Sequence, residues 1–311
     1  PEDPSLTTES TNRDERSLEF AVQDAIRWNE RFTTWVGLRH TRLSRDSVGT
    51  DGSSPTGYDE SLTTPWLAAS YSFAPGHQVY ASYGEGVESQ IVPNKAGQYS
   101  NAGVALPSLK SKQWELGIRG EADGWKWQAA WFRIERPMTN LDACARLFTT
   151  PCLGQYDGSA VHQGLEASTQ WTQGAWRLDG GILLLDAKRQ GSIAEPATNG
   201  QRPPNVPRWT LRSQAAWRVA GVPGLELQGR LSHEARRAVL PDASIQLPAW
   251  TRVDAALRYD TRINTMATTW TLGVDNLLGK RYWKESPYQY GHVYLFPGSP
   301  RTFRVTFQAS L

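Results

Sequence analysis

The sequence lacks any long apolar run. Its mean hydropathy is −0.53, and the longest apolar stretch is the short one from Gly180 to Leu185. A membrane-crossing helix needs about 18 or more such residues, so a helical membrane protein is excluded. A transmembrane β-barrel is not excluded, because its strands alternate lipid-facing and lumen-facing residues and are only half apolar.

Cysteine is almost absent. The two cysteines, Cys144 and Cys152, are separated by seven residues and lie in a turn-rich segment, residues 142–158. One close pair in an otherwise cysteine-free chain predicts a loop disulfide made in an oxidising compartment such as the periplasm. Two unpaired thiols are the alternative. A zinc site is disfavoured, since no histidine lies nearby at ligand spacing.

The sequence also lacks an excess of either charge and any catalytic motif. The 33 basic and 31 acidic residues are scattered, which gives no reason to expect a nucleic-acid partner. The five histidines are isolated from one another, and there is no phosphate-binding glycine loop and no Gly-x-Ser-x-Gly elbow. We therefore assign no catalytic residue and no metal ligand, and an enzyme is disfavoured.

Tryptophan, in contrast, is abundant. The chain has 14 Trp but only two Met. Trp suits a membrane–water interface, where its ring lies among acyl chains and its N–H among headgroups. A Trp-rich soluble sandwich or lectin fits the count equally well.

Apolar and polar residues alternate with a period of two. At the C-terminus, Phe303, Val305 and Phe307 fall on one face and Arg304 and Thr306 on the other. A soluble sandwich would bury that second face, and unpaired charges there would be costly. A single-layer sheet with lipid on one side and water or a plug on the other accounts for both faces.

This alternation predicts an all-β, antiparallel fold with about thirteen strands and no sustained helix. The predicted strands are residues 17–28, 32–46, 62–74, 78–86, 109–121, 124–136, 160–172, 175–188, 207–219, 224–236, 248–261, 267–279 and 299–311. Short turns alternate with long loops at 47–61, 87–108, 137–159, 189–206, 237–247 and 280–298. Short periplasmic turns and long extracellular loops are typical of outer-membrane barrels.

Two C-terminal stretches carry a family resemblance. Residues 273–283 read Gly-Val-Asp-Asn-Leu-Leu-Gly-Lys-Arg-Tyr-Trp, and residues 297–303 read Pro-Gly-Ser-Pro-Arg-Thr-Phe. They resemble the closing hairpin of TonB-dependent siderophore receptors, although Leu278 and Gly279 stand where Phe and Asp are usual and Leu311 ends the chain where an aromatic is usual. Further resemblances follow in the family's order at residues 79–86, 106–117, 164–166 and 205–207.

The resemblance implies a transmembrane barrel of about 22 strands closed by an N-terminal plug. Residues 17–311 would supply roughly its last thirteen strands, and the polar residues 1–16 are expected to form a flexible loop. We expect the export signal, the plug and its TonB box upstream of this sequence. The TonB–ExbB–ExbD system would act through that plug, in a Gram-negative outer membrane of lipid and lipopolysaccharide.

The function implied by the resemblance is uptake of a ferric siderophore, without enzymatic activity. Iron would be held by the siderophore, so no bound cofactor is expected. A passive porin-like channel, a receptor for haem or cobalamin, and a soluble all-β binding protein such as a lectin remain as alternatives.

The long loops are the expected ligand site. A ferric chelate is bulky, partly aromatic and often anionic, so aromatic rings and cations at a barrel mouth suit it. The alternative is that these aromatics belong to the outer girdle or pack the loops together. The candidate ligand-binding residues are Tyr99, Trp283, Tyr288, Tyr290 and Tyr294.

Overall fold

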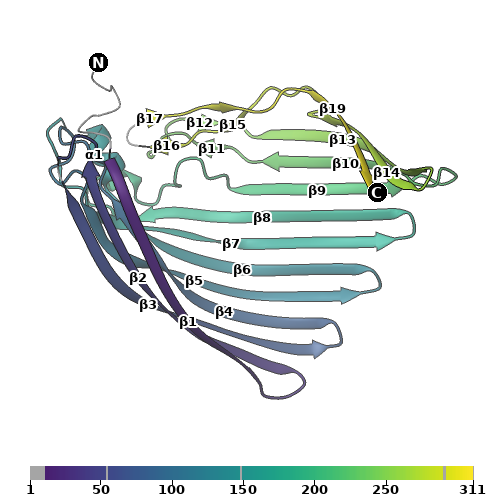
Figure 1. Ribbon diagram of the computed structural model, residues 1–311, viewed down its shortest axis with the longest axis horizontal. Coiled ribbons are helices and arrows are strands. Elements are labelled where there is room, and N and C mark those ends of the chain that lie inside the picture. Colours follow the sequence, from purple (N-terminus) through teal and green to yellow (C-terminus); the bar gives the residue numbers. More distant parts are fainter. Residues whose placement is uncertain (1–10, 54, 148, 290–291, 311) are drawn as a thin grey trace.

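Thirteen strands form one antiparallel sheet in which each strand pairs with its nearest long neighbours along the chain. The computed structural model describes residues 11–53, 55–147, 149–289 and 292–310. Figure 1 shows the sheet curved like part of a barrel wall, with β1 and β19 at its edges. The predicted all-β antiparallel fold is confirmed.

The strands fall into a long group and a mostly short group. β1 to β8 have 15 to 19 residues each, whereas β9, β10, β14 and β19 have nine or ten and β13 has 14. Their bounds are β1 (Thr11–Arg27), β2 (Phe32–Gly49), β3 (Thr56–Ala74), β4 (His77–Ile91), β5 (Ala105–Ala122), β6 (Trp125–Thr139), β7 (Tyr156–Gln173), β8 (Trp176–Gln190), β9 (Trp209–Arg218), β10 (Leu225–Glu234), β13 (Trp250–Ile263), β14 (Met266–Asp275) and β19 (Thr302–Ser310).

Several strands extend further into the loops than the apolar alternation predicts. β1 begins at Thr11, so residues 11–16 of the expected N-terminal loop are strand, while residues 1–10 lie outside the described residues. The loop expected at 47–61 shrinks in the same way. Polar partners hold these extensions, as where Arg45 Nη2 lies 2.7 Å from Glu15 Oε2 on the facing strand. The backbone hydrogen bonds between strands continue there although neither face is apolar, so the alternation of apolar residues cannot predict these strand ends.

The long connections carry short elements that the periodicity does not predict. A helix, α1 (Leu141–Leu147), and a 3₁₀ turn, η1 (Pro196–Thr198), lie in two of them. Among the described residues no helix is long and apolar enough to cross a membrane. Three small hairpins pair β11 (Arg237–Ala238) with β12 (Gln246–Leu247), β15 (Trp283–Glu285) with β18 (Phe296–Pro297), and β16 (Tyr288–Gln289) with β17 (His292–Val293).

The two faces of the sheet differ as the alternation predicts. Gln78, Arg119 and Gln128 lie side by side across β4, β5 and β6 and line a shallow hollow of about 580 Å³, which places the polar residues on the concave side. The opposite, convex face carries exposed apolar side chains such as Leu116 and Leu165. In these central strands, charged residues such as Arg119 therefore lie on the face opposite to the apolar one.

Tryptophans gather at the short-turn end of the sheet. Trp125 lies opposite Trp171 across the β6–β7 pair, and Trp176 stacks on Trp217 with ring centroids 5.8 Å apart. The short turns close the hairpins with left-handed residues, as at Gly124, whose φ is 78°. This clustering is the arrangement that an interfacial aromatic belt requires.

Candidate functional site

Two long connections pack into one body, here called the loop pair: residues 92–104 between β4 and β5, and residues 140–155 between β6 and β7. Its core is apolar and almost fully buried, with each member at most 6 % exposed. The core residues are Val92, Tyr99, Leu106, Leu141 and Cys144. The loop pair thus has a small hydrophobic core, to which Leu106 at the start of β5 contributes.

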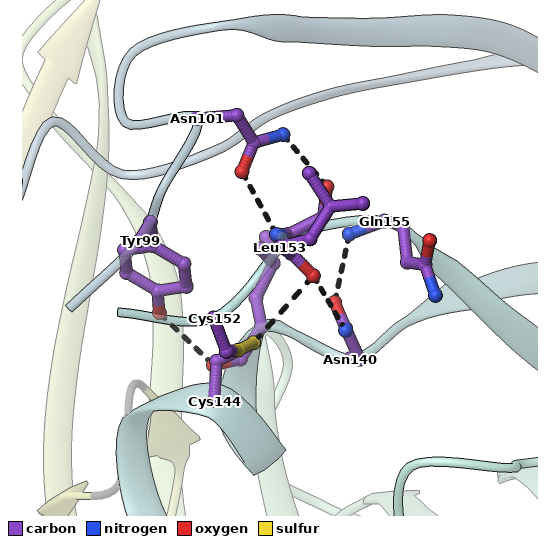
Figure 2. The surroundings of a disulfide bond; sticks show 9 residues. Tyr99, Asn101, Asn140, Cys144, Cys152, Leu153 and Gln155 are labelled. Carbon is purple, nitrogen blue, oxygen red and sulfur yellow. Dashed lines mark hydrogen bonds between the residues drawn. A yellow bond between two sulfur atoms is a disulfide. The ribbon is translucent and has the colours of Figure 1, made fainter. Parts of the chain in front are cut away.

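A disulfide closes the loop pair. Cys144 in α1 is bonded to Cys152, as expected from the sequence, with their Cα atoms 5.8 Å apart (Figure 2). Cys152 in turn pairs with the neighbouring loop, because its N–H donates to the Gln98 carbonyl and its carbonyl accepts from the Ser100 N–H, both at 3.0 Å. The disulfide therefore anchors α1 to a segment that already holds the two loops together.

Asparagine side chains complete the loop pair (Figure 2). The Asn101 amide donates to the Gly154 carbonyl and accepts from its N–H, each at 2.8 Å. The Asn140 amide does the same with the Leu153 carbonyl and the Gln155 N–H, also at 2.8 Å. These bonds satisfy backbone groups of residues 153–155, which lie outside the main sheet.

The structure places Tyr99 inside the loop pair. Its side chain is 1 % exposed, and its hydroxyl donates to the Leu141 carbonyl at 2.9 Å. No ring surface is left for a ligand in this arrangement. Tyr99 therefore packs the two loops together, which was the alternative to a role in ligand binding.

The other four candidates lie on one connection, residues 276–301 between β14 and β19. Tyr294 is 48 % exposed, Trp283 is 42 % exposed, and Tyr288 is half-buried in β16. Tyr290 lies outside the described residues. Tyr99 is buried, whereas the described candidates Trp283, Tyr288 and Tyr294 are at least partly exposed on this connection.

The same connection begins at a turn built on the buried Asn276. Its side chain is fully buried and its φ is 52°. The amide accepts from the Lys280 N–H at 2.8 Å and donates to the carbonyls of Lys280 and Ser299 at 2.8 and 3.0 Å. Its own N–H donates to Asp254 Oδ1 at 2.7 Å. Asn276 therefore ties both ends of the connection to β13, which gives the recognised motif a structural role.

Replacing Asn276 by Ala is expected to destabilise this turn by about 3 kcal/mol, because the backbone groups bound by its amide lose their partners and Ala tolerates a positive φ poorly. In the full-length receptor, the temperature at which the folded, fast-migrating form disappears from a semi-native gel should fall. Leu278→Ala is the matched control, since Leu278 is 68 % exposed in the same turn. Equal melting of the two variants would contradict this role.

An aromatic stack that the sequence analysis missed lies on the lumen side of this connection. The Tyr282 ring stacks on Trp250 with centroids 4.5 Å apart, and a Cβ at Gly298 would overlap the Tyr282 ring. The Arg212 guanidinium lies 5.7 Å from the Trp250 ring. The available signal was that Trp250 falls on the charged face of its strand, in alternation with Arg252.

A buried ionic cluster joins three long connections next to this stack. Arg237 is 5 % exposed and pairs with Glu234, which also pairs with Arg212. Arg237 Nη1 donates to Asn205 Oδ1 at 3.1 Å, and that oxygen also accepts from the Ser286 N–H at 2.9 Å. The connections after β8, β10 and β14 are therefore held as one assembly around the mouth.

The mouth offers contacts suited to binding and not a metal site of its own. In the part of the chain that the structure describes, no three His, Cys, Asp or Glu side chains are grouped to hold a metal ion. Exposed rings and hydrogen-bonding side chains can hold a ligand by stacking and polar contacts.

The family follows from comparison with known proteins. The family model described as "TonB dependent receptor-like, beta-barrel" matches residues 1–277. The chain belongs to the TonB-dependent receptor family. Members of this family are transport receptors of the Gram-negative outer membrane, not enzymes.

The curated receptors similar to this chain are much longer than it is. It is 26% identical over 208 residues to the ferrichrome receptor FcuA of Yersinia enterocolitica, which covers 66% of the chain and 26% of that protein. It is 27% identical over 316 residues to the metal-pseudopaline receptor CntO of Pseudomonas aeruginosa, covering 94% and 42%. The ferrioxamine B receptor of Salmonella typhimurium is 28% identical over 278 residues, covering 86% and 37%. The chain thus spans less than half the length of these relatives.

Solved structures of ferric siderophore receptors share the fold. The ferric preacinetobactin receptor BauA of Acinetobacter baumannii superposes with a TM-score of 0.81 at 25% identity, covering 96% of this chain and 44% of that one. The ferric yersiniabactin uptake receptor FyuA of Yersinia pestis gives 0.76 at 18% identity, covering 97% and 46%. The thirteen-stranded sheet therefore matches less than half of a complete receptor chain.

Proposed function

We propose that the receptor containing this chain takes up a ferric siderophore across the outer membrane, energised through TonB. The observation that carries the proposal is that curated relatives named for ferrichrome and ferrioxamine B align along 66% and 86% of this chain. By extension, the TonB–ExbB–ExbD system would supply the energy through the plug expected upstream. Outer-membrane lipid and lipopolysaccharide would surround the sheet.

The mouth supports this proposal through its chemistry. Tyr294 and Tyr288 lie on the connection that the Asn276 turn and the ionic cluster hold in place. Stacking on these rings and hydrogen bonds from the neighbouring loops would hold a bulky iron chelate. The siderophore itself would supply the iron ligands, so the protein needs no metal-binding cluster.

The test is binding of a panel of ferric siderophores to the full-length receptor in detergent, read by quenching of intrinsic Trp fluorescence. Ferrichrome and ferrioxamine B form one arm, and haem and cobalamin form another. Saturable quenching by one siderophore supports uptake of that class. Quenching only by haem or cobalamin would mean that the receptor binds that compound and not a siderophore. No quenching by any compound would favour a porin-like channel.

Tyr294→Ala is expected to weaken binding of the recognised siderophore about tenfold, the equivalent of about 1.4 kcal/mol of lost ring contacts. Because Tyr294 is 48 % exposed, little packing is lost with it. Leu295→Ala, which removes an adjacent side chain of 44 % exposure, is the control. The same fluorescence titration measures both variants, and equal affinities would show that Tyr294 does not contact the ligand.

A further inference from the structure

Arg212 of β9 and Arg230 of β10 lie on the concave face of the sheet. Ser168 borders the hollow on the concave side of β4 to β6 and lies opposite Gly181 across the β7–β8 pair. Gly181 in turn lies opposite Arg212 across the β8–β9 pair, and directly opposite residues of paired strands share a face. Arg230 lies opposite Gln214, which is two residues along β9 from Arg212. Both arginines are therefore on the concave side.

The two arginines border a second hollow, here called the arginine hollow, which has a volume of about 370 Å³. Gly181 lies at its floor and adds no side chain to fill it. Asp179 is the carboxylate at its border, and Asp179 Oδ2 lies 3.6 Å from Arg177 Nε. The charge of this carboxylate is therefore already compensated by Arg177, not by the two arginines of the hollow.

One carboxylate serves two arginines beside the arginine hollow. Arg212 pairs with Glu234, and Glu234 also pairs with Arg237. A single carboxylate compensates only one of these two guanidinium charges. The group formed by the three side chains therefore keeps a net positive charge.

Arg230 adds a second uncompensated charge. It is exposed, and its Nη2 donates to Gln214 Oε1 at 3.4 Å. Asp254 lies opposite Arg230 on β13, but its Oδ2 lies 2.9 Å from Arg252 Nη2. Within the described residues Arg230 forms no ion pair. Guanidinium groups thus outnumber carboxylates around the arginine hollow.

Cations continue from the arginine hollow toward the mouth. The Arg208 carbonyl accepts from the Leu185 N–H at 2.8 Å, and Arg202 Nη2 donates to the Leu185 carbonyl at 2.9 Å. Burial and the proximity of Arg208 hold the pKa of Arg202 below its ordinary value. Asp186 lies 3.9 Å from Arg202 but is already paired with Lys188 at 2.9 Å. Positive charge therefore extends along the connection that enters β9.

The neighbouring part of the concave face has the opposite charge. Glu115 of β5 lies on the same face as Arg119, and Glu166 of β7 lies on the same face as Ser168. Glu115 accepts from the Tyr80 hydroxyl at 2.6 Å. In the part of the chain that the structure describes, neither glutamate pairs with a cation. An anion inside the sheet would therefore be drawn toward β9 and β10 and away from β5 and β7.

We propose that Arg212 and Arg230 bind a negatively charged group of the transported ferric chelate, so that the receptor selects chelates with a net negative charge. Guanidinium groups bind carboxylate and catecholate oxygens through two N–H donors at once. The arginine hollow has room for one such group. The proposal rests on the proposed uptake and adds the charge class of its cargo. The other occupant to test is a carboxylate of the plug expected upstream.

The test compares two ferric chelates on the full-length receptor in detergent, read by quenching of intrinsic Trp fluorescence. A tris-catecholate chelate is anionic, because each catecholate carries two negative charges, whereas a tris-hydroxamate chelate without other charged groups is neutral. The parent should bind the tris-catecholate more tightly. In Arg212→Gln/Arg230→Gln this affinity should fall at least about tenfold, and the affinity for the tris-hydroxamate should change less than about twofold.

The matched control is Arg218→Gln/Arg258→Gln. It removes two cations from the same face at the short-turn end, where both lie opposite Glu226. The net charge of the receptor changes equally in the two double variants, so only the position of the lost charges differs. Both affinities of the control should stay within about twofold of the parent. An equal loss of tris-catecholate binding in the control would overturn the proposal.

Further outcomes separate this site from the proposed uptake. Raising the salt concentration should weaken binding of the tris-catecholate only, a readout that needs no variant. If the double variant loses its folded gel form, Arg230→Gln alone should still weaken tris-catecholate binding about threefold. Tighter binding of the tris-hydroxamate by the parent would contradict the charge selection and leave the proposed uptake standing. Binding of neither chelate would contradict both.

The plug as occupant gives a different result. If Arg212 and Arg230 pair with plug carboxylates, the double variant should melt at a lower temperature in the semi-native gel and keep the parent's affinity for both chelates. That combination would overturn the proposal.

Discussion

Expressed without further sequence, the 311-residue chain should form heterogeneous oligomers and no monodisperse monomer. Among the described residues, β1 and β19 are the two edges of the sheet, and each leaves one row of backbone N–H and C=O groups without a strand partner. Both edge strands also expose large apolar side chains, with Phe20 72 % and Val305 71 % exposed. Long, apolar, unpaired edges pair with other chains.

Size-exclusion chromatography with light scattering, after refolding into detergent, is the measurement for this prediction. The full-length receptor, prepared in the same detergent, is the control and should elute as one species. Limited proteolysis is a second readout, because proteases cut poorly paired strands but do not cut strands within a continuous sheet. A monodisperse and protease-resistant preparation of the 311-residue chain would show that this sheet is stable with its edges open.

Replacing Tyr99 by Ala should open the loop pair. The substitution removes the largest ring of a small core and leaves the Leu141 carbonyl without its donor, which together cost about 3–5 kcal/mol. The loop pair lies outside the main sheet, so the loss should be local. Hydrogen exchange in the full-length receptor should rise in residues 92–104 and 140–155 and stay unchanged in the strands.

Two variants make the Tyr99 result specific. Tyr99→Phe keeps the ring and loses one buried hydrogen bond, at a cost of about 1 kcal/mol, so its exchange should rise only slightly. Leu153→Ala removes a side chain of 56 % exposure from the same loop and should have no effect. If Tyr99→Ala exchanged like the parent, the disulfide and the asparagine bonds would suffice to hold the loop pair without the ring.

The sheet was predictable because its strands obey a rule that acts locally. Phe303, Val305 and Phe307 alternate with Arg304 and Thr306, and this pattern requires no knowledge of the rest of the chain. The strand ends were not predictable in the same way. Beyond the apolar band both faces are polar, so residues 11–16 look like a loop although the ladder with β2 continues through them.

The site was predicted less well because its contacts are long-range. Tyr99 and Leu141 are 42 residues apart, and neither carries a local pattern that pairs them. The Asn276 motif was recognised, yet only the structure shows that its amide binds Lys280 and Ser299. Trp250 did leave a signal, since an aromatic on a charged strand face needs a partner, and Tyr282 provides it.

Because the strands differ in length, the wall of the sheet has a tall side, formed by β1 to β8, and a low side, formed by β9 to β19. At about 3.4 Å per residue, β3 with its 19 residues runs for roughly 65 Å, whereas β10 with ten residues runs for roughly 34 Å. The upper wall above β9 to β19 is therefore made of connections, joined by a few side chains such as Arg237 and Asn276. An entrance of this shape opens obliquely, and any change of its width on ligand binding should come from the low side, since paired strands such as β1 and β2 extend to the upper end of the tall side.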